Sequence, residues 1–185
     1  MPELNDLSGP FNPNLTFDDF SKDFLLKLIR AWQFAWVRLQ QTVFDAVRER
    51  FGLEAATECT LEALSRMSER VNPRYAKLAN IQLNTVVDSL KCLQLPLDNI
   101  IGGLYPAEFD IKSPNHVVMT ITHCRSLLAC EREAPELIET QCHVMEKPMI
   151  EKYLVNPKIK VTPLKLPPRK SPDEIACQWE FKLED

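Results

Sequence analysis

The sequence predicts an α+β fold, in which an N-terminal helical layer of about three helices packs with a small antiparallel sheet. Apolar residues recur at helical spacing through residues 16–105, whereas residues 106–185 hold short alternating segments separated by proline-containing turns. The chain has 185 residues, 45% of them hydrophobic and 26% charged, which suits one buried core. We therefore expect a flexible arm over 1–15 and a single domain over 16–185.

Three helices are expected in the N-terminal half. Thr16 can cap the first one, and acidic residues follow it. Asn72-Pro73 separates the second helix from the third, since proline disfavours helical backbone at the residue before it. The expected helices span about 16–51, 54–71 and 74–93, with a short helical turn within 96–104.

The C-terminal half is expected to follow a β-β-α-α-β-β order. The strands should span about 108–112, 116–124, 158–165 and 175–183, and the helices about 125–134 and 144–155. Side chains alternate between the two faces of a strand, so Cys177, Trp179 and Phe181 share a face, which we expect to point inward.

Charge and composition exclude several classes of function. The net charge is −4, and the basic cluster of Lys165, Arg169 and Lys170 is too small for a nucleic-acid footprint. No apolar stretch reaches the eighteen residues of a membrane span, and the N-terminus lacks a signal-peptide pattern. We expect a cytoplasmic protein with reduced thiols. Four glycines and no phosphate-binding loop argue against a nucleotide cofactor.

Three of the six cysteines are candidate metal ligands. Cys124 is placed at the end of a strand, Cys142 just before a helix and Cys177 on the inward face of the last strand. In the expected fold these positions can converge, and three sulfur ligands suit zinc, iron or an iron–sulfur centre. The fourth ligand would be water, substrate or a nearby side chain; the candidates are His123, Glu131, His143 and Glu146. On spacing alone, ordinary buried cysteines are the commoner outcome.

Cys142 is also a candidate nucleophile. A position before a helix would lower the pKa of its thiol, and His143 is the adjacent candidate base. Neighbouring residues at a helix start rarely face each other, so the pair does not by itself form a catalytic dyad.

The aromatic residues Trp32, Phe34 and Trp36 of the first helix have two interpretations. They can line a pocket for an apolar ligand or form the interface of a homodimer. Core packing is the more common use of such a pattern, and we expect it for Trp32 and Trp36.

Several segments carry a family resemblance. They are FGLEAA at 51–56, TITHC at 120–124, Glu131, Cys142, NPKIKV at 156–161, PP at 167–168 and CQWEF at 177–181. These segments resemble an uncharacterised family of anaerobic bacteria and archaea, related to the L-2-amino-thiazoline-4-carboxylic acid hydrolase-like proteins. A more distant likeness is to the four-vinyl-reductase-type small-molecule-binding domain.

The resemblance implies the α+β fold and gives more weight to Cys124, Cys142 and Cys177, without implying a reaction. Relatives often carry a further cysteine before the Pro-Pro loop, where this chain has Pro163, Leu164 and Leu166. The resemblance therefore implies a three-cysteine site that another group completes.

Three hypotheses about function follow. The first is a small-molecule-binding protein with a metal or iron–sulfur site at the three cysteines. The second is a non-catalytic binding module that dimerises through the aromatic helix. The third is a hydrolase or transferase that uses Cys142. The sequence identifies neither the small molecule nor a reaction.

Overall fold

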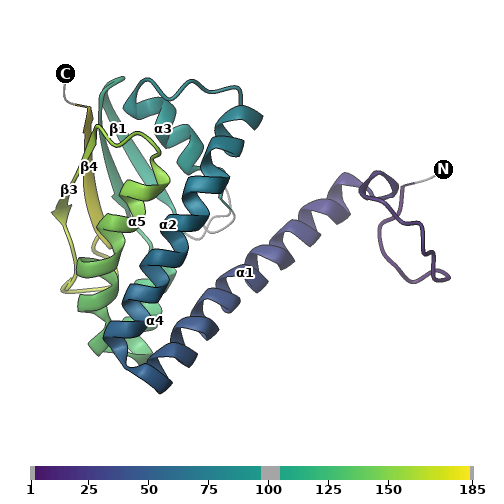
Figure 1. Ribbon diagram of the computed structural model, residues 1–185, viewed down its shortest axis with the longest axis horizontal. Coiled ribbons are helices and arrows are strands. Elements are labelled where there is room, and N and C mark those ends of the chain that lie inside the picture. The colour runs from purple at the N-terminus through teal and green to yellow at the C-terminus, as the bar shows by residue number, and fades with distance from the viewer. Residues whose placement is uncertain (1–2, 97–104, 184–185) are drawn as a thin grey trace. The chain divides into compact units, whose positions relative to one another are not determined.

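The computed structural model describes residues 3–96 and 105–183, and it combines helices with a four-stranded antiparallel sheet (Figure 1). The predicted α+β fold is thereby confirmed. The chain divides into two compact units, Met1–Thr42 and Val43–Asp185, each of which is considered by itself. The helical turn expected within 96–104 lies outside the described residues.

The α-helices are α1 (Lys22–Phe51), α2 (Leu53–Leu78), α3 (Val86–Leu93), α4 (Arg125–Glu133) and α5 (Glu146–Tyr153). The strands are β1 (Ala107–Ser113), β2 (His116–Ile121), β3 (Ile159–Lys165) and β4 (Cys177–Leu183). Short 3-10 helices span Phe17–Asp19 and Pro135–Leu137, and a π-helix spans Glu139–Met145.

Backbone hydrogen bonds join the N-terminal segment to the start of α1. The Leu4 N–H donates to the Asp19 carbonyl at 2.8 Å, and the Ser21 N–H donates to the Leu4 carbonyl at 2.9 Å. The Ser21 hydroxyl donates to Asn5 Oδ1 at 2.7 Å. Farther along α1, the Trp32 ring meets Phe17 edge to face, with 5.8 Å between ring centroids.

Helix α2 continues through Pro73, so the prediction that it ends before Asn72 is wrong. The buried residues Ser68, Asn72 and Ala76 follow one another at intervals of four on one face of the helix, on both sides of the proline. Asn72 Nδ2 donates to the carbonyl of Lys152, at the end of α5, at 3.1 Å. Packing of this face outweighs the helix hydrogen bond that the proline removes.

The third helix is also shorter than predicted, because α2 takes over the residues after Pro73. Asn80 has a φ of 54°, and the Ile81 N–H donates to the Ala76 carbonyl at 2.9 Å. A left-handed residue followed by a hydrogen bond that spans six residues is a common way for a helix to end, and asparagine tolerates the left-handed conformation. A new helix, α3, begins at Val86, where Thr85 Oγ1 accepts a hydrogen bond from the Asp88 N–H at 3.1 Å.

The strands form the sheet in the order β1-β2-β4-β3, and every neighbouring pair is antiparallel. Met119 of β2 lies opposite Trp179 of β4, and Val117 lies opposite Phe181. All four side chains are buried, with Val117, Trp179 and Phe181 fully so, and the burial of Trp179 and Phe181 confirms the predicted inward face of the last strand.

Helices α3, α4 and α5 contribute to the same core as the sheet. Leu90 of α3, Leu127 of α4 and Leu154 of α5 pack in one apolar cluster with Trp179 and Phe181. Helix α2 packs on α5, so helices gather on one face of the sheet (Figure 1). A smaller cluster gathers side chains from α1, α2 and the π-helix: Phe44, Ala56 and Met145.

Candidate functional site

The three candidate metal-ligating cysteines, called the thiol cluster below, pack against the same apolar core. Cys124 is the N-cap of α4, Cys142 lies inside the π-helix and Cys177 is the first residue of β4. All three are partly buried against the main core. Strand β2 ends at Ile121, so the prediction that Cys124 ends a strand is wrong, and so is the prediction that Cys142 precedes a helix.

The thiols of the cluster interact electrostatically. Burial raises the pKa of the Cys124 thiol to about 11 and that of Cys177 to about 12, and it raises the pKa of Cys142 further still. Negative charge on Cys124, Cys130 or Cys177 also raises the pKa of Cys142. The expectation that a helix start lowers the pKa of Cys142 is wrong, because loss of water around the thiol is the largest effect.

Glu146, the first residue of α5, lies beside this cluster. Burial raises the pKa of its carboxyl from 4.5 to about 7, although the residue as a whole is partly exposed. Its negative charge raises the pKa of Cys124, Cys142 and Cys177 alike. Of the four side chains considered as a fourth ligand, Glu146 is the one that acts on all three thiols.

Two sulfurs of the cluster accept hydrogen bonds from N–H groups. The backbone N–H of Leu127 donates to Cys124 Sγ at 3.3 Å, as a helix-capping contact. The buried indole Nε1–H of Trp179 donates to Cys177 Sγ at 3.2 Å. Each bond acts to lower the pKa of its thiol, which means that it stabilises a thiolate at that position.

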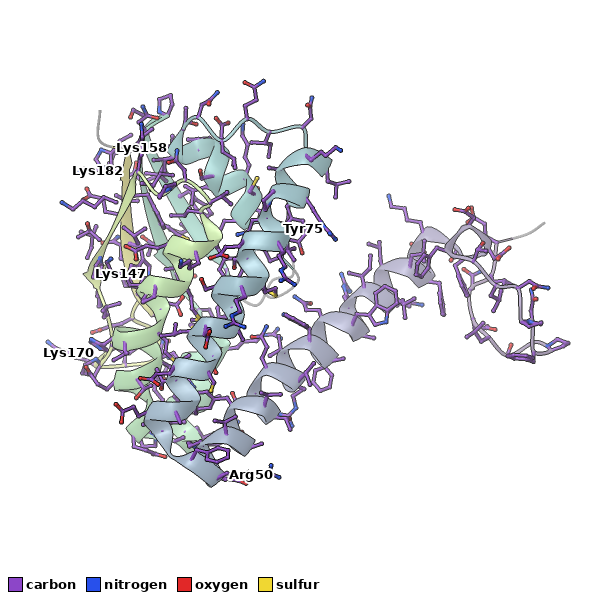
Figure 2. The ribbon with its side chains drawn as sticks, in the orientation of Figure 1. Arg50, Tyr75, Lys147, Lys158, Lys170 and Lys182 are labelled. Carbon is purple, nitrogen blue, oxygen red and sulfur yellow. The ribbon has the colours of Figure 1, made fainter. Side chains whose placement is uncertain are left out.

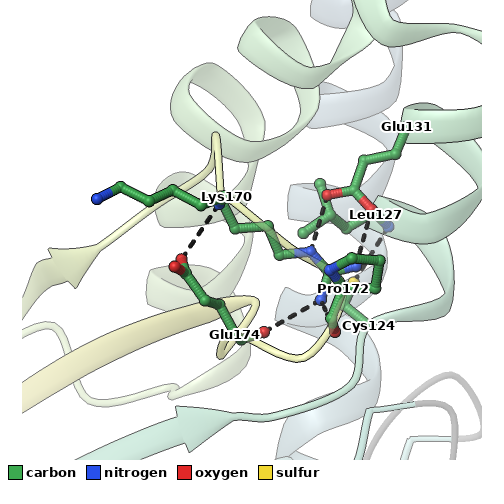
Figure 3. A network of polar contacts seen from close by, with 7 residues as sticks. Cys124, Leu127, Glu131, Lys170, Pro172 and Glu174 are labelled. Carbon is green, nitrogen blue, oxygen red and sulfur yellow. Dashed lines mark hydrogen bonds and ion pairs between the residues drawn. The ribbon is translucent and has the colours of Figure 1, made fainter.

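Arg169 fastens the proline-containing loop between β3 and β4 to α4, and Figure 3 shows its partners Glu131, Pro172 and Glu174. The Arg169 side chain is 1% exposed and forms two hydrogen bonds to the Glu131 carboxylate, at 2.8 and 2.7 Å. It also donates to the carbonyls of Pro172 at 2.8 Å and Glu174 at 3.1 Å. The Glu131 carboxylate raises the pKa of Arg169, and a negative charge on Cys124 adds to this effect, so the guanidinium lies within electrostatic reach of that sulfur.

The other candidate ligands and bases have different surroundings. His143 Nε2 lies 2.6 Å from the Pro167 carbonyl, which can only accept, so this nitrogen carries the proton. His123 is exposed, and Glu131 is paired with Arg169. Arg169 holds the pKa of Glu131 below its ordinary value. His143 and Glu131 therefore hold the proline-containing loop and α4 in place.

Within residues 3–96 and 105–183, no three His, Cys, Asp or Glu side chains are grouped tightly enough to hold a metal ion as they stand. Metal binding at the thiol cluster would therefore need rotation of side chains. The three cysteines that are not candidate metal ligands lie elsewhere: Cys59 is exposed on α2, and Cys92 and Cys130 are buried.

Trp32 and Trp36, the candidate pocket residues, belong to the first unit. Trp32 is 45% exposed and contacts Phe17, while Trp36 is partly buried. A separate open pocket of about 530 Å³ lies in the second unit, lined by residues that include Leu83, Lys158 and Leu183. Lys158 and Lys182 mark that end of the sheet in Figure 2, and Lys170 marks the loop end. Because Cys177 begins β4 and Leu183 ends it, the pocket and the thiol cluster lie at opposite ends of the sheet.

A sequence profile of the Family of unknown function (DUF6125) matches residues 18–183. No curated protein and no solved structure is significantly similar to the chain. The resemblance to an uncharacterised family is consistent with this match, whereas the relation to the hydrolase-like and reductase-type proteins stays a prediction. Among the residues that the structure describes, no helix has the length and apolar character needed to cross a membrane.

Proposed function

Because the chain belongs to the Family of unknown function (DUF6125), its activity has to be inferred from its own side chains, and we propose that it is a small-molecule-binding protein with a metal site at the thiol cluster. Cys124, Cys142 and Cys177 supply thiolate ligands for zinc or iron. Glu146 supplies the fourth ligand. The observation that carries the proposal is that the three cysteines pack against one apolar core, where the charge of this one carboxyl acts on all three thiols.

The surroundings of the sulfurs support metal binding over simple burial. Metal-bound thiolates are commonly stabilised by N–H donors and by nearby positive charge. Leu127 and Trp179 provide such donors, and Arg169 provides the charge near Cys124. A closed arrangement requires the side chains to turn toward a common centre, and the energy of metal–sulfur bonding would drive that rotation.

The raised pKa values of the three thiols determine how many protons are released when a metal ion binds. All three thiols are protonated at neutral pH without metal, because the pKa of each lies well above 7. Binding therefore releases a proton from each thiol that becomes a ligand, and affinity should rise steeply with pH. The same raised pKa disfavours the alternative in which Cys142 is a nucleophile, since the thiolate is the reactive form.

Glu146 is the position at which a small molecule would enter the site. A carboxylate is a harder ligand than a thiolate, and it is bound less firmly by a soft metal. A ligand with a sulfur or nitrogen donor would replace it.

The experiment is elemental analysis of the full chain purified without oxygen, combined with an assay for acid-labile sulfide to detect an iron–sulfur centre. One zinc or iron per chain is expected. Replacing Cys142 with Ser should abolish stoichiometric metal, and Glu146→Gln should weaken affinity roughly tenfold or more. Cys59→Ser, on the exposed face of α2, and Cys92→Ser, buried in α3, are the matched controls.

Cobalt substitution gives a second readout. Co²⁺ bound by thiolates has an intense sulfur-to-metal absorption, which should be present in the chain and in both controls and should fall in Cys124→Ser and Cys177→Ser. A chain without stoichiometric metal and without this absorption, or cluster variants that bind as the controls do, would refute the proposal.

A further inference from the structure

The first helix carries an apolar stripe, called the α1 stripe below, and none of its residues belongs to the two apolar clusters described above. It consists of Leu25, Ile29, Trp32, Trp36, Leu39 and Val43. The intervals between these residues alternate between four and three, which is the heptad spacing that keeps one face of a helix toward a partner helix. Ile29, Trp32, Leu39 and Val43 are 43%, 45%, 56% and 52% exposed.

We propose that the α1 stripe is a dimer interface, and that its partner is the same stripe of a second copy of this chain. The heptad spacing is the first argument. When two identical helices with this repeat lie side by side, the side chains of one helix pack into the gaps between the side chains of the other along their length. The spacing continues for nearly three heptads without a charged residue at a stripe position.

The area of the stripe is the second argument. Four stripe side chains about half exposed, together with Leu26 beside them at 46%, present roughly 500 Å² of apolar surface per copy. Two copies would bury roughly 1,000 Å², the lower end of the range for specific interfaces. Phe17, which is 61% exposed and packs on Trp32, adds to the same surface.

The distribution of charge is the third argument. The basic residues Lys27, Arg30 and Arg38 fall at heptad positions on the side of the helix away from the stripe. The residues that flank the stripe between 26 and 42 are uncharged; they are Leu26, Leu28, Gln33, Ala35, Gln40 and Thr42. Two copies can therefore meet along the stripe without bringing like charges together.

The test is the mass of the full-length chain in solution, by sedimentation velocity across a concentration series. The wild type should sediment as a dimer of the 21.3 kDa chain. Ile29→Glu and Leu39→Glu should both give monomers. Phe34→Glu is the matched control, because Phe34 is 69% exposed on the opposite side of the same helix, and it should leave the dimer intact.

A milder change protects the test against misfolding. Leu39→Ala keeps helix propensity and should weaken dimerisation at least tenfold, since each dimer loses two interface leucines. Circular dichroism should show unchanged helix content. A wild-type monomer throughout the series, stripe variants that remain dimers, or a Phe34→Glu variant that dissociates as readily as the stripe variants would each overturn the proposal.

Discussion

Removing the Arg169 side chain should destabilise the second unit more than any other single change in the loop between β3 and β4. The side chain is 1% exposed and makes four hydrogen bonds, two to the Glu131 carboxylate and two to backbone carbonyls. In Arg169→Met, the carbonyls of Pro172 and Glu174 lose their donor, and the carboxylate loses its ion pair. Breaking a fully buried pair costs about 3 to 5 kcal/mol.

The expected loss lies at the lower end of that range, because Glu131 is 28% exposed and can be solvated again by water. We expect the free energy of unfolding to fall by about 3 kcal/mol, and the melting temperature by roughly 6 to 12 °C for a chain of this size. Urea unfolding followed by circular dichroism measures the first quantity, and calorimetry measures the second.

Lys170→Met is the matched control in the same loop. The Lys170 side chain is exposed, and the residue joins the network through its backbone N–H, which donates to Glu174 Oε2 at 3.2 Å (Figure 3). Its stability should change by less than about 0.5 kcal/mol. If Arg169→Met and Lys170→Met are equally stable, the guanidinium does not fasten the loop and the reasoning fails.

Three further predictions test other parts of the structure. Pro73→Ala restores an N–H inside α2 at an exposed position, so urea unfolding should show stabilisation by about 1 to 2 kcal/mol; a loss would mean that the helix needs the proline. Arg169 holds the pKa of Glu131 below its ordinary value, so the ionised carboxylate stabilises the fold above its unfolded pKa and that contribution is lost as pH falls through the folded pKa. Unfolding of Glu131→Gln should therefore depend less on pH than the wild type between about pH 5 and pH 3, and equal slopes would contradict this sign. Trp179→Phe removes the N–H donor to Cys177 and should lower stability by about 1 to 2 kcal/mol in chemical denaturation, whereas an unchanged midpoint would mean that the bond contributes nothing.

The sheet could be predicted from the sequence because its strands alternate cleanly. Period-two patterns place Trp179 and Phe181 on one face, and both are fully buried there. The alternation along each strand is enough to predict which side chains are buried. Helices cover one face of this sheet, so a shift of the register by one residue would turn the apolar side chains away from the core.

The ends of the helices could not be predicted in the same way, because tertiary contacts decide them. Pro73 is a strong local stop signal, yet Asn72 binds a carbonyl of α5 and the helix continues. The actual stop at Asn80 has a local signal, a left-handed asparagine, but asparagine is also common elsewhere in loops.

The candidate site stays a prediction. The sequence places Cys124 at the end of a strand and Cys142 before a helix, and both placements are wrong, yet all three cysteines pack against the main core. Their raised pKa values could not be predicted, since the extent of burial depends on the whole fold. Glu146 was one of four candidates for the fourth ligand, and its proximity to the thiols becomes visible only when the π-helix and α5 are in place.

The wide turns of the π-helix set the rotational phase between Cys142 and the helix that follows it. A π-turn accommodates one residue more than an α-turn does, so the chain on its two sides is offset by one residue. Val144, which is 49% exposed, lies within these wide turns, so deleting it would change the direction of Cys142 relative to the core-facing side of α5. The direction in which this thiol points is thus controlled by segment length, and a protein with one residue fewer here would present a different side chain to the other two sulfurs.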